Sequence, residues 1–309
     1  MAGTRFAGFL AAEPVVMWRP VFEELNVTIA SREQLIALGA SGALLTSAVR
    51  EHLLIRVRRD HYALPTTPRP VLHAVRIGGR LACTSALRDY GVFGFDHLLH
   101  VHMRKEASRS RSPVRRDIPL TPHNRLGAHL HWQPLGYPGE GNEYRVGLVD
   151  ALSQAVRCNE RWHAIASLDN AIHQGKLSER ELARVFQLVP ERYKDLRADI
   201  DGRSEAGQET VLRCAFRAVG MEPELQVEIP GVGRVDLVVE GRMIIEADSR
   251  QAHDGWELHV RDRDRDIDAA RLGYMSLRPA FNRTMYATSD VVEAVLHLLA
   301  ATRRFRTIL

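Results

Sequence analysis

The alternation of apolar and polar positions over residues 31–65 predicts two helices followed by a hairpin. A capping box at Ser31 and Gln34 begins the first helix. The second helix has an apolar face of Leu45, Val49 and Leu53 and an opposite, exposed face of Thr46, Ser47 and Arg50. Apolar and basic residues then alternate over 55–59, as in a half-buried strand that leads into a polar turn. This order of elements is typical of a winged helix.

A winged helix can bind DNA with two of its parts, because the second helix enters the major groove while the basic wing contacts phosphates. The candidate DNA-binding residues are Thr46, Ser47 and Arg50 on the helix and Arg56, Arg58 and Arg59 in the wing. Many three-helix units share this pattern without touching DNA. The pattern favours DNA binding and leaves a purely structural unit as the alternative.

The middle of the chain reads as a mixed α/β region with less regular patterning. The pattern over residues 73–93 predicts a short helix around a Gly-Gly turn. The proline-containing sequence that follows, up to about residue 135, predicts irregular strands and loops. Helical spacing returns over 146–188, and the polar stretch 193–207 is the candidate boundary. We therefore expect an α/β (α+β) multidomain protein with a winged helix-turn-helix at 1–70, a mixed α/β region at 71–199 and an α/β/α sheet domain at 200–309.

The last hundred residues have the order helix, strand, strand, strand, helix, strand, helix. On the first of these helices, 205–219, the buried face extends back to two acids, Glu209 and Glu205. Acids are seldom buried without a partner, so they either cap the helix start or point into a polar site beneath it. Capping is the better account of Glu205, and for Glu209 the two alternatives are equal.

The predicted hairpin around residues 240–242 is apolar apart from three carboxylates, those of Asp236, Glu246 and Asp248. If residues 240–242 form a three-residue loop, Asp236 lies directly opposite Glu246 and both share a face with Asp248. A two-residue loop would place Asp236 and Glu246 on opposite faces of the sheet. A shared carboxylate site therefore requires an odd loop, with which Gly241 is compatible.

Carboxylates held this close raise one another's pKa unless a cation compensates them. Mg²⁺ (or Mn²⁺) suits Asp236, Glu246 and Asp248 because it takes carboxylate oxygens, and it could activate a water that attacks a phosphodiester. His253, five residues beyond Asp248, could serve as general acid or base because the ordinary histidine pKa lies near neutrality. The alternative is an edge hairpin whose acids face solvent, together with a structural histidine.

The net charge of +4 is concentrated in two stretches, 55–59 and 103–116. Basic stretches attract polyanions, so nucleic acid is a plausible partner, although a solvated loop explains either stretch taken alone. Opposite charges three residues apart explain most of the charged helix 257–272. Arg263 lies on or beside the inner face of that helix and could reach the site or a phosphate.

No spacing in the sequence supports a metal site made of cysteines and histidines. The cysteines, Cys83, Cys158 and Cys214, are far apart and form no Cys-x-x-Cys pair. The histidines include two His-x-His pairs, His100 with His102 and His129 with His131. These could bind metal if they lay on adjacent strands, but we expect satisfied or exposed histidines because no carboxylate or cysteine stands at a supporting spacing. No stretch is long and apolar enough for a membrane span, and we expect a cytosolic protein.

The stretch GRVDLVVEGRMIIEAD resembles the Asp…Glu-x-Lys core of the PD-(D/E)xK nucleases, whose domains are restriction-endonuclease-like. With the residues that follow, it looks like the Vsr-like (very-short-patch-repair-like) endonuclease domains of actinobacterial proteins. The resemblance implies metal-binding roles for Asp236 and Glu246 and a catalytic role for His253, and it matches Glu209 to a glutamate of the preceding helix. Asp248 stands where the superfamily usually has lysine, a departure that also occurs among Vsr-like domains.

Upstream, LIRVRRDHYALP resembles the winged-helix start of AbiEi-family antitoxins, and GGRLACTSALRDYGVF matches the middle of the same actinobacterial architecture. Such antitoxins repress their own operons by binding DNA. The resemblance therefore implies a DNA-binding protein with a Mg²⁺-dependent endonuclease domain, whose partners are double-stranded DNA and a cognate toxin or another defence or repair protein. The alternative is a non-catalytic regulator of antitoxin type that retains the nuclease fold only as a scaffold.

Overall fold

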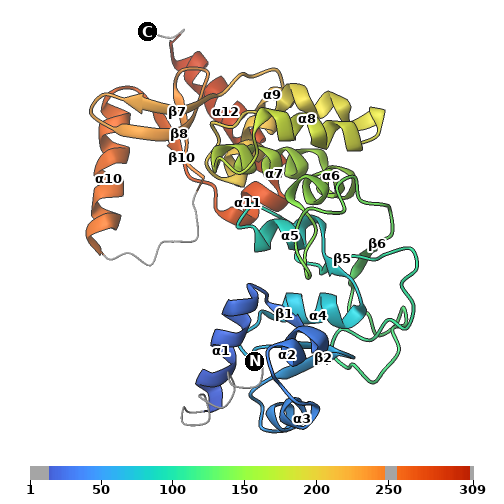
Figure 1. Cartoon of the computed structure of the whole chain (residues 1–309). Helices are drawn as coiled ribbons and strands as arrows, with labels where there is room; N and C mark the ends of the chain where they lie inside the picture. The colour runs from blue at the N-terminus through green and yellow to red at the C-terminus, as the bar shows by residue number, and fades with distance from the viewer. Residues whose placement is uncertain (1–13, 248–255, 307–309) are drawn as a thin grey trace. The chain divides into compact units, whose positions relative to one another are not determined.

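The computed structural model describes residues 14–247 and 256–306 (Figure 1). The protein is a mixed α/β chain whose described residues form three small sheets and many helices. It divides into two compact units: Met1–Tyr90 with Asp96–Gln154 make unit 1, and Gly91–Phe95 with Ala155–Leu309 make unit 2. The boundary passes within one continuous helix, α6 (Leu148–Cys158). Of the helices that are described, none has the length and apolar character needed to cross a membrane.

Unit 1 begins with six elements, of which the last four are the two helices and the hairpin that the hydrophobic pattern predicts. In chain order they are α1 (Pro14–Leu25), β1 (Ile29–Ser31), α2 (Arg32–Ala37), α3 (Gly42–Arg50), β2 (Ile55–Arg58) and β3 (His61–Ala63). The predicted capping box is confirmed, since Ser31 Oγ accepts from Gln34 N–H (3.1 Å) and Gln34 Oε1 accepts from Ser31 N–H (2.7 Å). The three strands form an antiparallel sheet in the order β1-β3-β2, and the three helices share one core with it around Trp18 and Leu35.

The remainder of unit 1 is built on a second small sheet. Its elements are α4 (Arg69–Ile77), β4 (Arg80–Leu81), α5 (Cys83–Asp89), β5 (His100–His102) and β6 (His129–His131). β4 pairs antiparallel with β5, and β5 pairs in parallel with β6. The two His-x-His pairs therefore lie on adjacent strands. The segment 103–128 that joins these strands contains no named helix or strand, only an isolated bridge between Arg111 and Pro119.

Unit 2 starts with a group of packed helices. They are α7 (Arg161–His173), α8 (Glu179–Leu188), the 3₁₀ helix η2 (Glu191–Asp199) and α9 (Gly207–Ala218). The capping box at Ser178 and Glu181 that begins α8 has both of its hydrogen bonds. The polar stretch 193–207 is the predicted domain boundary. Its first part, up to Asp199, belongs to η2, and Leu196 in this part is buried.

The C-terminal part of unit 2 has three layers, with helices on both faces of a sheet. Its elements are β7 (Glu224–Ile229), β8 (Gly233–Val239), β9 (Met243–Ile245), α10 (Trp256–Arg271), β10 (Met275–Leu277), α11 (Phe281–Tyr286) and α12 (Thr288–Arg306). The strand order is β10-β9-β8-β7, with β10 parallel to β9 and the other pairs antiparallel. One face packs on α9 and α12 through Leu237 and Val239, and the other packs on α10 through Val238 and Ile244 (Figure 1). The expected element order is confirmed, except that two helices follow the last strand.

Candidate functional site

The outer face of α3 carries the three residues predicted for it. Thr46 and Arg50 are exposed, and Ser47 is half-buried. Ser47 Oγ donates to Glu51 Oε1 (2.5 Å) and accepts from Arg50 Nη2 (3.3 Å), and Arg50 also pairs with Glu51 at 3.7 Å. One carboxylate therefore balances part of the positive charge on this face.

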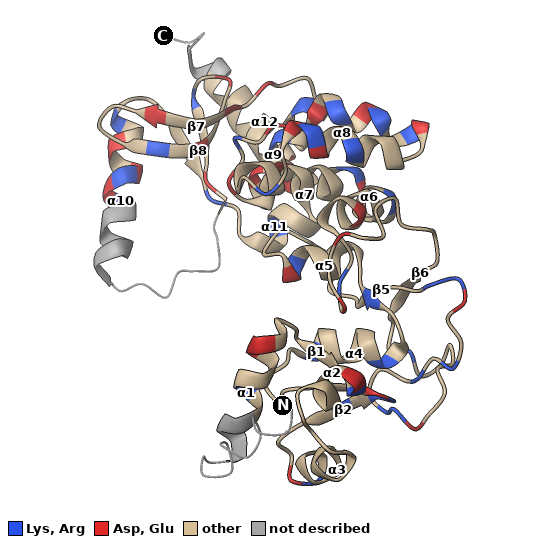
Figure 2. Cartoon of the chain, viewed as in Figure 1, with Lys and Arg blue, Asp and Glu red and all other residues tan. Residues whose placement is uncertain are grey.

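The arginines of the predicted wing line a depression of about 650 Å³ in unit 1. Its other wall is the 103–128 segment, so the two basic stretches of the sequence lie side by side (Figure 2). The lining arginines are Arg56, Arg58, Arg59, Arg109, Arg111 and Arg116, and the lining acids are Asp60 and Asp117. Arg116 Nη1 donates to the carbonyl oxygen of Arg56 (3.1 Å), which ties the segment to β2. With six cations and two carboxylates, this surface is positively charged.

Arginines in and beside this depression are held close to one another. Burial lowers the pKa of Arg58, and nearby Arg111 lowers it further. The pKa of Arg76 is likewise lowered by burial and then by Arg116. Arg76 is fixed in place because its Nη1 donates to the carbonyl oxygen of Pro113 (2.7 Å). Since an anion relieves repulsion between like charges, the depression suits a negatively charged group.

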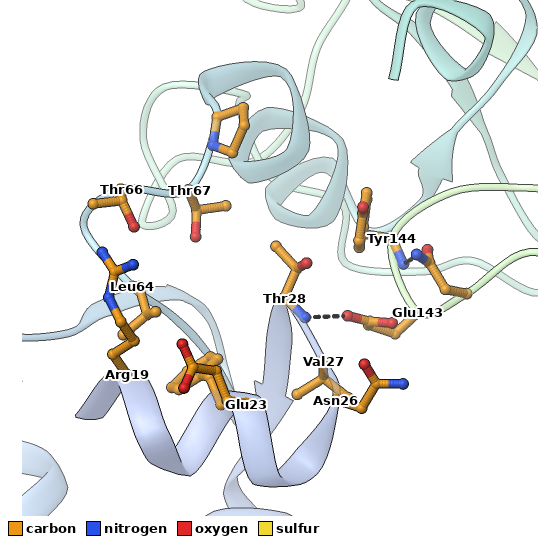
Figure 3. Close-up of a pocket in the computed structure, with 13 residues that line it drawn as sticks. Arg19, Glu23, Asn26, Val27, Thr28, Leu64, Thr66, Thr67, Glu143 and Tyr144 are labelled. Carbon is orange, nitrogen blue, oxygen red and sulfur yellow. Dashed lines mark hydrogen bonds between the residues drawn. The ribbon is translucent and has the colours of Figure 1, made fainter. Parts of the chain in front are cut away.

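A second depression of unit 1, of about 580 Å³, lies beside α1, the start of β1 and the turn at 142–144 (Figure 3). Glu143 Oε1 accepts hydrogen bonds from the backbone N–H groups of Thr28 (2.7 Å) and Ile29 (3.0 Å). The carboxylate thus satisfies donors at the start of β1 that have to find a partner. Glu143 therefore connects the 142–144 turn to the start of β1 within unit 1.

The acidic hairpin has the register that a shared carboxylate site requires. The paired residues of β8 and β9 are Val239 with Met243, Val238 with Ile244 and Leu237 with Ile245. Residues 240–242 therefore form a three-residue loop, which is the odd loop that a shared carboxylate site requires. If this register continues one residue beyond its last pair, Leu237 with Ile245, Asp236 stands opposite Glu246. Asp236 Oδ2 accepts a hydrogen bond from the N–H of Ala247 (2.9 Å).

Glu246 is held between two arginines. Its Oε1 lies 3.1 Å from Arg265 Nη2 on α10, and its Oε2 lies 2.8 Å from Arg278 Nη1, just after β10. Burial raises the pKa of Glu246, while Arg278 and Arg265 oppose that rise and Asp236 adds to it. The negative charge of Glu246 is thus already balanced by two guanidinium groups.

Glu209 caps its helix, the first of the two alternatives for this residue, and it is also buried close to Asp236. Its carboxylate accepts hydrogen bonds from the N–H groups of Glu205 and Ala206 (both 3.0 Å), so it caps the start of α9. The side chain is also buried, and burial together with the charge of Asp236 raises the pKa of Glu209 to about 7. The pKa of Asp236 is raised as well, mainly by burial.

The prediction that Glu205 caps this helix is wrong. The helix begins at Gly207, and Glu205 precedes it, with Oε1 2.9 Å from Arg234 Nη1 on β8. The capping group is instead Glu209, whose longer reach back from inside the first turn satisfies the free N–H groups.

Electrostatic interactions link Asp236 to both Glu246 and Glu209, so the structure brings these three predicted acids into one neighbourhood. Asp248 and His253 lie outside the described residues. Arg263 is exposed on α10, with Nη1 3.7 Å from Asp266 Oδ2. That distance agrees with the pairing of opposite charges three residues apart.

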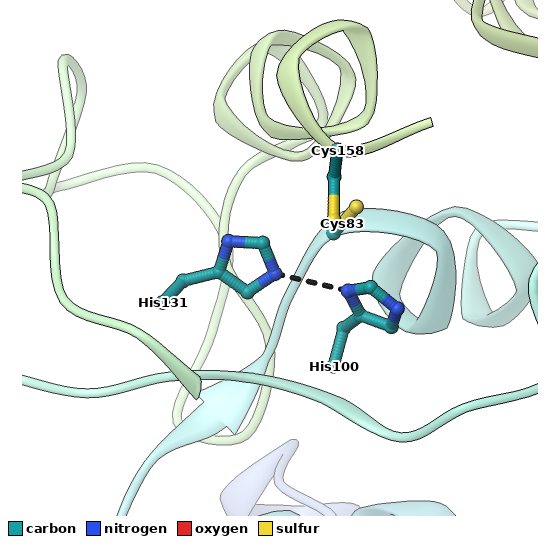
Figure 4. A group of neighbouring side chains, drawn as sticks. All are labelled: Cys83, His100, His131 and Cys158. Carbon is teal, nitrogen blue, oxygen red and sulfur yellow. Dashed lines mark hydrogen bonds between the residues drawn. The ribbon is translucent and has the colours of Figure 1, made fainter. Parts of the chain in front are cut away.

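A different set of side chains has the arrangement of a metal site. Among the described residues, the group of His, Cys, Asp and Glu side chains whose ligand atoms all lie within 4.8 Å of one another is Cys83, His100, His131 and Cys158 (Figure 4). The expectation that the histidines lack cysteine partners is therefore wrong. Cys83 begins α5 and Cys158 ends α6, and only folding brings them to β5 and β6.

Comparison of the sequence with models of known protein families gives no match, and comparison with curated proteins gives none either. The resemblances to PD-(D/E)xK nucleases and to AbiEi-family antitoxins therefore stay predictions based on the motifs. The function has to be inferred from the residues of the chain itself.

Proposed function

We propose that this protein binds double-stranded DNA through unit 1. The observation that supports the proposal is the depression in which six arginines, from segments 56–59 and 109–116, come together. Phosphates bound there would release condensed counterions from the duplex and reduce the repulsion among the arginines. Such contacts would position the duplex, and α3 of the same unit offers Thr46, Ser47 and Arg50 for contacts to base edges.

The second part of the proposal is that the sheet domain of unit 2 hydrolyses phosphodiester bonds. Its support is the three-residue loop at 240–242, whose register would set Asp236 opposite Glu246 if it continued by one residue, and the electrostatic coupling of Asp236 to both Glu246 and Glu209. The order α9-β7-β8-β9-α10-β10, with β10 parallel to β9, also suits the restriction-endonuclease-like fold that the motif implies.

The acids of this site suit a hard divalent cation. Asp236 and Glu246 offer the oxygen ligands that Mg²⁺ or Mn²⁺ prefers, with Asp248 or Glu209 as a further ligand. Burial raises the pKa values of Asp236, Glu246 and Glu209, and a bound cation would oppose that rise. A bound ion would lower the pKa of an attacking water and polarise the phosphodiester. His253 is the proposed general acid or base.

A non-catalytic DNA-binding regulator of antitoxin type is the second candidate. The observation that favours it is the pairing of Glu246 with Arg265 and Arg278, because these guanidinium groups already supply the positive charge that a metal would bring. In that case the sheet domain is a scaffold, and the partner beside DNA is a cognate toxin or another defence protein.

Two assays separate the candidates. Fluorescence anisotropy with a labelled duplex, repeated over a range of salt concentrations, tests DNA binding by the full chain. Incubation of plasmid and of mismatched duplex with Mg²⁺ or Mn²⁺ tests cleavage by wild type against Asp236→Ala. Cleavage by wild type alone supports the nuclease. Salt-dependent binding without cleavage by either protein supports the regulator, and absence of binding overturns both.

A further inference from the structure

The side chains of Cys83, His100, His131 and Cys158 present two thiols and two imidazoles to one point in the fold (Figure 4). Their ligand atoms all lie within 4.8 Å of one another. In a tetrahedral zinc site with bonds of about 2.0 to 2.3 Å, neighbouring ligand atoms are roughly 3.3 to 3.8 Å apart. To reach that geometry, the longest separations would contract by about 1.5 Å at most, and the 2.9 Å contact between His100 Nδ1 and His131 Nε2 would widen slightly.

The position of Cys158 follows from helix α6 itself. Gln154, which belongs to unit 1, accepts at Oε1 a hydrogen bond from the backbone N–H of Cys83 (2.9 Å). Residues four apart on a helix lie one above the other on the same face. The bond that fixes Gln154 therefore also brings Cys158, the last residue of the same helix, next to Cys83.

The ring of His100 has the orientation and the outer support of a metal-binding histidine. Its Nε2 lies 2.7 Å from Asp96 Oδ2, and Oδ1 of the same carboxylate accepts from Leu98 N–H (2.8 Å). A proton on Nε2 satisfies this contact and leaves Nδ1 unprotonated, as a nitrogen that binds metal has to be. That Nδ1 faces His131 Nε2 at 2.9 Å, so the two imidazoles converge from paired strands. A carboxylate behind the histidine is the usual second layer of zinc sites.

The backbone conformation of Cys83 is an independent indication of a ligand site. Its φ is +46°, a conformation that is unfavourable for any residue with a side chain, and the residue is completely buried. Strain of this kind persists where the surrounding structure requires a side chain in one place. Here it directs a thiol toward two imidazoles and a second thiol.

We propose that Cys83, His100, His131 and Cys158 bind one zinc ion in a closed, structural site. Two sulfur and two nitrogen ligands suit zinc, whereas Mg²⁺ takes oxygen ligands. Because the protein fills all four tetrahedral positions, no position is left for a substrate or a reacting water. The site shares no residue with the proposed nuclease site, and it does not rest on DNA binding.

The ion would hold both ends of the basic 103–128 segment. His100 lies in β5 before the segment and His131 lies in β6 after it, and each strand has only three residues. Strands this short contribute few ladder hydrogen bonds, so a metal that joins them closes the loop more firmly than their pairing does. Zinc would thereby help to keep the arginines of the segment beside the wing.

The test is the metal content of the full chain, purified in reducing buffer from cells supplied with zinc and measured by inductively coupled plasma mass spectrometry. Wild type should contain about one zinc per chain. Cys83→Ser and His131→Gln should lose nearly all of it. Two matched controls should retain it: His129→Gln, from the same strand as His131, and Cys214→Ser, the third cysteine, on α9.

A spectroscopic measurement on wild type keeps the test independent of whether the variants fold. Chelated protein titrated with Co²⁺ should develop thiolate-to-cobalt charge transfer and the visible bands of tetrahedral cobalt, saturating at about one equivalent. A lack of both stoichiometric zinc and this spectrum would overturn the proposal. So would loss of zinc from both controls as well as both ligand variants, or a Cys83–Cys158 disulfide in protein kept under native redox conditions.

Discussion

Asp169 on α7 and Arg213 on α9 form an ion pair from which solvent is completely excluded, with Arg213 Nη2 2.7 Å from Asp169 Oδ2. The same carboxylate accepts from Thr210 Oγ1 (2.8 Å) and from the N–H of Asp201 (2.8 Å). One aspartate therefore joins two helices and the segment that follows η2. Removing it would leave a buried guanidinium without its counterion.

Asp169→Ala is expected to lower the free energy of unfolding of unit 2 by about 3–5 kcal/mol. The matched control is Asp195→Ala, which removes a partly exposed pair with Arg161 and should cost less than about 1 kcal/mol. Urea denaturation followed by circular dichroism measures both variants. Equal losses for the two would contradict a special role for the buried pair.

His102 on β5 should make unit 1 sensitive to acid. Burial, followed by Arg80 and Arg104, lowers the pKa of His102 from 6.5 to about 4, and its buried Nδ1 has no hydrogen-bond partner among the described residues. Because the folded-state pKa lies below the ordinary one, the stabilising contribution of neutral His102 is complete above pH 6.5. It is lost as the pH falls from 6.5 through 4.

His102→Gln removes this titration, so the free energy of unfolding of the variant should fall less than that of wild type between pH 6.5 and 4. Urea titrations at several pH values measure the difference. His123→Gln, exposed in the 103–128 segment, should keep the wild-type pH dependence. Parallel curves for wild type and His102→Gln would show that this histidine does not cause the acid sensitivity.

The double substitution Arg59→Ala with Arg109→Ala should weaken DNA binding without changing the fold, because both side chains are exposed in the arginine-lined depression. If each contacts one phosphate, the slope of log affinity against log salt should become shallower by about 0.9 per arginine. Arg125→Ala is the control, since Arg125 is exposed in the same 103–128 segment and does not line the depression. An unchanged slope in the double variant would place the DNA elsewhere.

Asp236→Asn should abolish metal-dependent cleavage while the protein stays folded. The amide oxygen can still accept from Ala247 N–H, and a buried carboxylate with a raised pKa is removed. Loss of a metal ligand should cost several kcal/mol in the transition state, which is about two orders of magnitude or more in rate. Glu228→Gln, an exposed acid on β7, should cleave like wild type. Cleavage by Asp236→Asn at the wild-type rate would exclude this carboxylate from the chemistry.

Removal of zinc should loosen the 103–128 segment more than the rest of unit 1. Hydrogen exchange followed by mass spectrometry, compared between wild type and His131→Gln, should be faster in this segment and little changed in α4. Exchange that is equally fast throughout unit 1 would indicate general unfolding rather than release of a metal-closed loop.

Several features could be derived from short stretches alone. The capping boxes at Ser31 and Ser178 were recognisable because each depends on residues three apart. The pairing of Val239 with Met243 around a three-residue loop is also compatible with the sequence, since Gly241 suits such a loop and the loop length sets the register. The error at Glu205 arose because spacing gives a helix face but not the residue at which the first turn starts.

By itself, then, the sequence determined the main helices, the hairpins and the faces of their residues, because those depend on neighbours within one or two turns. Only the tertiary structure decided which faces meet. It placed the two basic stretches around one depression, and it brought Cys83 and Cys158 to two histidines that lie on separate strands. These contacts join residues that are far apart in the chain. Their approach depends on how whole helices and strands pack together, which the spacing of residues within one element does not predict.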